Sequence, residues 1–392
     1  MPIVFVHGVN NRDGADYQEN ELGRNEFLRE VVAPALGLPP KDLLIESPYW
    51  GGDAAKFFWQ MAVLPDDKDT YEKFGAGEDI ETLGRTAELV ASSAPIEGGI
   101  VTRARQDMAE AADLLYGAAV ASAGTKDEAN AIAKSYLAAV AYLEKKPDLS
   151  WLDKATDDNF ADLLNYHVEK VAEEESMGGT GILDQLKEGL SRLINTVPDA
   201  GTELLNKFAR KKLNETVTRF TGDAFTYLRE RGEPGKEGRI VQKVMAGLKK
   251  GNDAKASAKS SSGKDDKLIV IAHSFGGEIM YDILTRFWPD LEVDCLITVG
   301  SQVGLFEEMK LYLASDANIP AHYPDGRVSK PGKVKRWLNV FDMNDVLSYR
   351  VTPVFDGAED FAYDTGYSTL QAHGGYFLRP SFYVRLAKRL QQ

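Results

Sequence analysis

The sequence predicts an α/β protein: a doubly wound, mostly parallel sheet that a large all-helical insertion interrupts. Short runs of β-branched and apolar residues alternate with helical patterns at both ends of the chain. The predicted strands are Pro2–Val6, Leu43–Glu46, Leu268–Ala272, Asp294–Val299 and Val334–Phe341. From about Asp53 to Glu233, by contrast, strand patterns are absent and apolar residues recur at helical spacing. We therefore expect an α/β domain formed by residues 1–53 and 233–392, and a helical insertion over residues 54–232.

The insertion is expected to cap the end of the sheet where ligands bind, or to pair with a second copy of the chain. Its predicted helices are Val101–Ala123, Asp127–Glu144, Asn159–Glu174, Ile182–Ile194 and Thr202–Leu228, separated by Gly and Pro breaks. Its most apolar stretch, Lys56–Leu64, favours core packing, with a lipid-contacting surface as the alternative. After the insertion, a helix is expected over Ile240–Leu248, and Gly251–Asp266 is typical of a flexible surface loop.

Composition excludes several classes of protein. The 392 residues carry a net charge of −14, which argues against a nucleic-acid partner because phosphate binding needs a basic surface. The single cysteine, Cys295, excludes an internal disulfide and a cysteine-based zinc site. Neither a signal peptide nor an apolar run of about 18 residues is present, so we expect no transmembrane segment and a cytoplasmic location.

One short motif carries the chemistry. Ser274 lies in Ala272-His273-Ser274-Phe275-Gly276-Gly277, between an apolar predicted strand and the predicted helix Gly277–Phe287. A serine at such a sharp strand-to-helix turn is held with its hydroxyl exposed, which suits a nucleophile. The close approach of strand and helix requires small residues two before and two after the serine, and Ala272 and Gly276 meet that requirement.

A nucleophilic serine needs a base and an acid that orients the base. In folds with such a turn these groups follow in the order Ser, acid, His. Only His322 and His373 come after Ser274, and His373 lies before the last predicted helix, where the base is expected. His322 precedes the strand that should supply the acid, so we interpret it as a surface residue. Two acids follow that strand: Asp345 is favoured and Asp342 stays open as the alternative.

The oxyanion formed in acyl transfer needs two backbone N–H donors. One is expected from Phe275, the residue after the nucleophile, and the other from the loop after the first strand, where Val9 is the candidate. His7 precedes that loop and is interpreted as a structural hydrogen bonder beneath it. No group of His and carboxylate residues has metal-ligand spacing, so neither a metal nor another cofactor is expected.

Several segments, taken in order, resemble the α/β-hydrolase superfamily, and within it the lipase-like esterases with an A-H-S-x-G nucleophile turn. They are FVHGVNNR, PYWGGD, GDAFTYL, IVIAHSFGGEIMYDIL, ITVGSQVG, WLNVFDMNDVLSYR and AHGGYF, which together span roughly residues 1–53, 220–250 and 267–392. The resemblance implies Ser274 as nucleophile, His373 as base, Asp345 as acid, and Phe275 and Val9 as oxyanion donors. Ala272 replaces a usual glycine, and Val346 stands where such acids are often followed by proline, which leaves the choice between Asp342 and Asp345 open.

Two hypotheses of function follow. The favoured one is a serine hydrolase that cleaves a carboxylic ester, a lipid ester among the candidates, through an acyl-enzyme on Ser274. Its partner would be a small-molecule or lipid ester. The alternative is a partner-binding or signalling protein whose helical insertion is the functional module on an inactive or regulated hydrolase scaffold.

Overall fold

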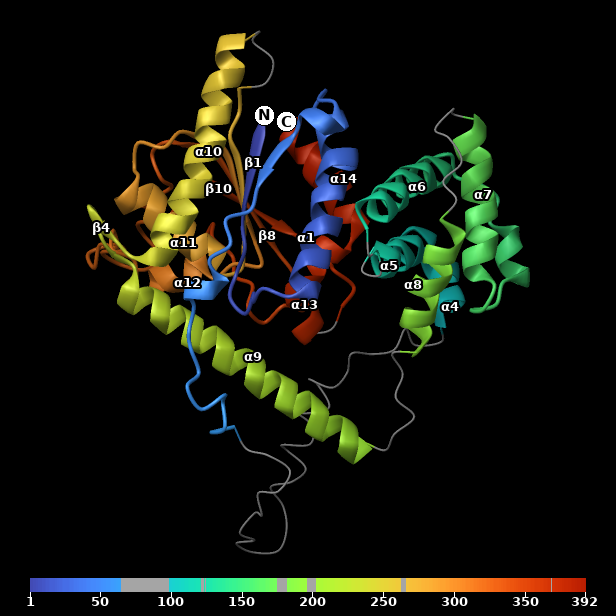
Figure 1. The fold of residues 1–392 in the computed structure, drawn as a ribbon, viewed down its shortest axis with the longest axis horizontal. Helices are drawn as coiled ribbons and strands as arrows, with labels where there is room; N and C mark the ends of the chain where they lie inside the picture. The colour runs from blue at the N-terminus through green and yellow to red at the C-terminus, as the bar shows by residue number, and fades with distance from the viewer. Residues whose placement is uncertain are drawn as a thin grey trace, which may run out of the picture. The chain divides into compact units, whose positions relative to one another are not determined.

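The computed structural model describes residues 1–64, 99–120, 123, 125–174, 182–195, 202–261, 266–367 and 369–392 (Figure 1). The described residues group into two compact units. The first unit draws on the segments Met1–Asp13, Asp42–Val90 and Asn206–His373, and the second on Gly14–Lys41, Ala91–Leu205 and Gly374–Gln392. Residues 14–41 and 374–392 therefore group with helices of the predicted insertion, and the predicted domain limits stay a prediction.

A six-stranded sheet forms the centre of the first unit, and all of its neighbouring strands pair in parallel. Its strands are β1 (Pro2–Val6), β2 (Leu44–Glu46), β5 (Ile269–His273), β6 (Val293–Val299), β8 (Val334–Phe341) and β10 (Ala358–Ala362). Short two-stranded pairs are formed by β3 (Gly232–Glu233) with β4 (Lys236–Glu237), and by β7 (Val328–Ser329) with β9 (Phe355–Asp356). The predicted α/β class is thus confirmed, and all five predicted strands agree with the structure to within a residue at each end.

The first unit combines helices with a sheet whose central strands are largely buried. The helices are η3 (Gly51–Asp53), α9 (Thr202–Glu230, from Asn206 onward), α10 (Arg239–Ser261), α11 (Gly276–Asp282), η5 (Ile283–Phe287) and α12 (Val303–Glu308). Helix α10 contacts β1 and β2, and α11 contacts β5 and β1 (Figure 1). Strand β5 is buried from Ile269 to Ala272, which is typical of a parallel strand covered on both sides.

The order of the strands places a switch point between β1 and β5. The sheet runs β10-β8-β6-β5-β1-β2, so the chain extends the sheet in one direction from β1 to β2 and in the other from β5 onward. Ligands of doubly wound sheets bind beyond the carboxyl ends of the strands at such a point. Val6 and Ala272 are in register there, so His7 and His273 follow side by side at the carboxyl edge of the sheet.

The second unit is helical. Its elements are α1 (Ala15–Phe27), η1 (Leu28–Val32), α2 (Ala33–Ala35), α4 (Gly99–Gln106), α5 (Met108–Val120), α6 (Lys126–Glu144), η4 (Ser150–Lys154), α7 (Phe160–Glu174), α8 (Leu183–Asn195), η6 (Tyr376–Leu378) and α14 (Pro380–Leu390). The turn η2 (Pro40–Asp42) and helix α13 (Thr369–Gly375) cross from one unit's segments into the other's. Within this unit the buried Asp113 of α5 pairs with Arg379 and accepts hydrogen bonds from the backbone and hydroxyl of Ser381, and so holds the start of α14.

Three expectations about helices differ from the structure. Gly251–Asp266 is not a loop throughout, because α10 continues to Ser261; residues 262–265 lie outside the described residues. Gly251 belongs to this helix: a Cβ there would lie 2.6 Å from a methyl carbon of Val4, so the glycine lets α10 approach the sheet. The predicted helix Val101–Ala123 divides at Asp107 into α4 and α5, and His373 lies in α13 rather than in a loop.

The expectation of core packing for Lys56–Leu64 is wrong for Phe58, Trp59 and Val63. These residues are 85%, 80% and 84% exposed, respectively. Within the described residues, no helix combines the length and apolarity that crossing a membrane would require.

Candidate active site

Ser274 occupies a strained turn between β5 and α11. Its φ is +51°, a conformation that L-residues other than Asn, Asp and His rarely adopt and that costs on the order of 1–3 kcal/mol. The turn is fixed on both sides: Ser274 N–H donates to the carbonyl of Val299, and Gly277 N–H donates to the carbonyl of Ser274. A Cβ on Gly276 would lie 2.4 Å from the Val6 carbonyl oxygen, so only glycine fits where the sequence predicted a small residue.

The predicted nucleophile, base and acid lie in one hydrogen-bonded line. Ser274 Oγ is 2.8 Å from His373 Nε2, and His373 Nδ1 is 3.0 Å from Asp345 Oδ2. Because a carboxylate accepts, His373 Nδ1–H donates to Asp345, and Nε2 is left to accept the Ser274 hydroxyl proton. Asp345 is fully buried, whereas the His373 side chain is 18% exposed. The line has the order and geometry that activate a serine hydroxyl, although Ser274 itself is buried.

The two candidate acids have different partners. Asp345 Oδ1 also accepts a hydrogen bond from the backbone of Leu347, which orients the carboxylate toward His373. Asp342 instead accepts bonds from the backbone of Asn344 and from the backbone and hydroxyl of Thr365. Of the two acids, the structure brings Asp345 to His373, and Asp342 holds the loop after β8.

His273 contacts the backbone of His373, the predicted base. Its Nε2–H donates to the carbonyl oxygen of His373 at 2.8 Å, and the two imidazole rings lie 5.1 Å apart. Burial and the neighbouring His373 lower the pKa of His273 to about 3. His273 therefore stays neutral at physiological pH and adds no positive charge beside the base.

His7 anchors the loop after β1, as predicted. Its Nδ1–H donates to the Gly8 carbonyl, and its Nε2 accepts from the backbone N–H of Trp50, whose indole stacks on the imidazole at 4.8 Å. A Cβ on Gly8 would lie 2.5 Å from Ser274 Cβ and 3.0 Å from Ser274 Oγ. The backbone of this loop therefore lies directly against the serine side chain.

The two predicted oxyanion donors share an unusual feature. In the part of the chain that the structure describes, neither the Val9 N–H nor the Phe275 N–H has a hydrogen-bond acceptor. Both residues are buried, at 9% and 0% exposed. Buried backbone N–H groups are almost always paired, so these two are free to donate to a ligand oxygen.

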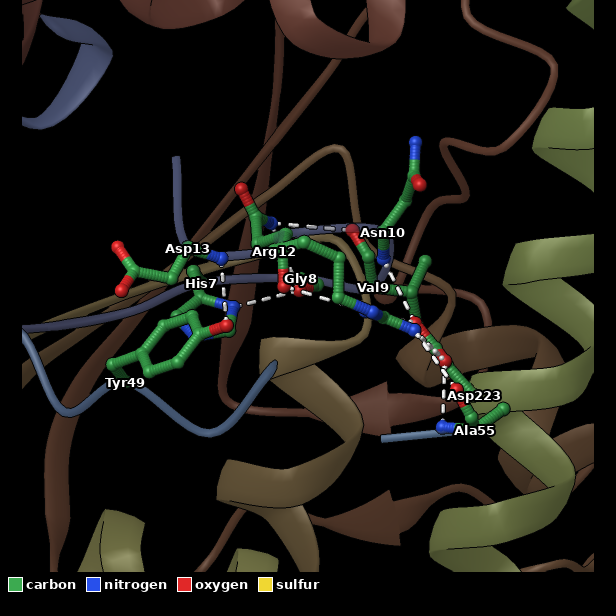
Figure 2. Close-up of polar contacts among 10 residues, drawn as sticks. His7, Gly8, Val9, Asn10, Arg12, Asp13, Tyr49, Ala55 and Asp223 are labelled. Carbon is green, nitrogen blue, oxygen red and sulfur yellow. Dashed lines mark hydrogen bonds and ion pairs between the residues drawn. The ribbon is translucent and has the colours of Figure 1, made fainter. Parts of the chain in front are cut away.

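The contacts that hold this loop in place correspond to none of the predicted site residues. The carboxylate of Asp223 on α9 accepts from the backbone N–H groups of Asn10 and Ala55 and pairs with Arg12 (Figure 2). These residues are up to 213 positions apart, and no local pattern joins them. The phrase GDAFTYL was the one signal in the sequence, since the resemblance included it without assigning a role to its aspartate.

Comparison with known protein families, with curated proteins and with solved structures found no match. Within the described residues, no three His, Cys, Asp or Glu side chains are grouped so that they could hold a metal ion.

Proposed function

We propose that the chain is a serine hydrolase of the α/β-hydrolase fold, with the helical insertion as its cap. Supporting this class are the parallel sheet, the serine at the switch point and the chain order Ser274, Asp345, His373. The observation that carries the proposal is the continuous line from Ser274 Oγ through the imidazole of His373 to Asp345, at 2.8 and 3.0 Å.

More particularly, we propose that it cleaves a carboxylic ester, lipid esters included. Ser274 Oγ attacks the ester carbonyl while His373 Nε2 takes the hydroxyl proton, and Asp345 stabilises the imidazolium that forms. The N–H groups of Val9 and Phe275 bind the oxyanion of the tetrahedral intermediate. His373 then gives the proton to the departing alcohol, and the same groups direct water to the acyl-enzyme. These steps need no metal or other cofactor.

A fluorophosphonate probe tests the class, because it phosphonylates an activated serine whatever the natural substrate. We expect the purified full chain to be labelled, and Ser274→Ala and His373→Ala to lose labelling by at least about 10³-fold. His322→Ala is the matched control, since His322 is exposed and follows Ser274 in the sequence as His373 does. A series of p-nitrophenyl esters from acetate to palmitate then gives the preferred acyl length. A folded wild-type chain that neither reacts nor turns over would refute the proposal and leave the partner-binding alternative.

A further inference from the structure

Helix α9 contacts both chain segments that carry the proposed oxyanion donors. Phe220, Asp223 and Tyr227 follow one another at spacings of three and four residues and so share one face of the helix. We infer that this face positions the oxyanion hole, and that Asp223 is the positioning residue of the loop that carries Val9. The inference rests on the proposed function, because it assigns a support to that same site.

The loop that carries Val9 is held in place at the residue after Val9. Asn10, the next residue, has a φ of +61°, the left-handed turn conformation that asparagine adopts more readily than most residues. Its backbone N–H donates to Asp223 Oδ2 at 2.9 Å. The carboxylate of Asp223 thereby fixes the peptide that follows Val9, and with it the direction of the loop.

Arg12, two residues after Asn10, binds the same carboxylate. Its two terminal nitrogens donate to Asp223 Oδ1 at 2.7 Å and Oδ2 at 3.1 Å, a bidentate arrangement (Figure 2). The backbone N–H of Ala55 adds a further bond to Oδ1 at 3.0 Å. Asp223 is fully buried, and each of its oxygens is satisfied by two donors. A buried carboxylate with four donors is a rigid support, because any displacement of the loop would leave charge unpaired.

Helix α9 also contacts Phe275, whose N–H is the other proposed donor. Its ring is fully buried and meets Phe220 and Tyr227 edge-to-face, with centroids 6.3 and 5.4 Å away. Tyr227 is itself held by a hydrogen bond from its hydroxyl to Asp282. One face of α9 thus contacts the side chain of the residue that supplies one donor and the loop that supplies the other.

The test is Asp223→Asn in the full chain, with Glu230→Gln as control. The amide places an NH2 group among the donors that now face Oδ1 or Oδ2, so at least one support of the loop is lost. Glu230 is an exposed carboxylate on the same helix that pairs on the surface with Arg229. We expect Asp223→Asn to lower both kcat and the rate of fluorophosphonate labelling by roughly 30- to 100-fold, approaching the loss of one oxyanion donor. KM should stay within about threefold, and the pH profile should not move, because the line from Ser274 to Asp345 is intact.

A trifluoromethyl ketone with the best acyl chain supplies the readout that a merely structural role would not affect. Its adduct with Ser274 carries an oxyanion, so its inhibition constant should rise by the same factor as kcat falls. Arg12→Ala keeps the inference falsifiable should Asp223→Asn not fold, and we expect about a tenfold loss of kcat from it with the same pattern. Variants within threefold of wild type, or losses that appear in KM or shift the pH profile, would overturn the inference. An unreactive wild type would instead overturn the proposed function.

Discussion

Gly8→Ala is the sharpest single perturbation of the candidate site. The added Cβ would lie 2.5 Å from Ser274 Cβ, 3.0 Å from Ser274 Oγ and 3.0 Å from the His273 carbonyl oxygen. Carbon atoms in contact prefer about 3.5–4.0 Å, so the loop and the serine must separate by about 1 Å. A misplacement of that size costs on the order of 100-fold in rate, which corresponds to about 2.7 kcal/mol in the barrier.

The assay compares fluorophosphonate labelling rates and ester turnover of Gly8→Ala and Gly14→Ala. Gly14 has no atom within 4 Å of the position of an added Cβ, and its φ of 168° is extended backbone, so its substitution should be neutral. Thermal unfolding shows whether each variant is folded, since overpacking alone costs about 1–3 kcal/mol. If folded Gly8→Ala reacts within threefold of wild type, the loop does not lie against the reacting serine, and the geometric argument fails.

Three further predictions concern buried carboxyl groups. Asp345→Asn should lower kcat in ester kinetics by on the order of 10³–10⁴-fold. Asp342→Asn should retain labelling and lose about 1–3 kcal/mol of stability in urea unfolding. Equal kinetic losses in the two variants would contradict the assignment of the acid. Burial raises the pKa of Glu278 to about 8, so its native carboxyl keeps a proton that the unfolded chain releases. The free energy of unfolding should therefore fall as pH rises from about 4.5 to 8. Glu278→Gln should flatten that slope in urea titrations. Asp113→Asn should destabilise the second unit by about 3–5 kcal/mol, since it removes the negative charge that pairs with the buried Arg379; an unchanged unfolding midpoint would exclude this pair as a support.

The parts of the site predicted from sequence are those that local patterns encode. Ser274 was found because its strand, turn and helix are contiguous, and His373 because few histidines follow the serine. The acid stayed ambiguous, since Asp342 and Asp345 both follow β8 within four residues. Only the folded chain shows that Thr365 binds the first, while His373 binds the second.

The parts that were missed depend on contacts between distant segments. Strand β10 has the sequence AEDFA, which carries no alternation, and it is a strand because it pairs with β8. Gly251 was interpreted as a loop residue, although its missing side chain serves helix packing against Val4. Asp223 is polar and lies in a helix, so nothing in its neighbourhood distinguishes it from a solvated surface acid until Asn10 and Arg12 are placed beside it.

The strand order also determines how early in synthesis the site can form. Strand β1 is made before β5, with which it pairs, and Val6 is separated from Ile269 by 263 positions in the chain. At about 5–20 residues per second, the ribosome needs roughly 10–50 s to supply that partner. Until then β1 lacks its partner strand and has an unpaired edge that other nascent chains can bind, so chaperones are expected to act on β1 and β2. The same delay keeps Gly8 and Ser274 apart, and the growing chain carries no assembled site before β5 is made.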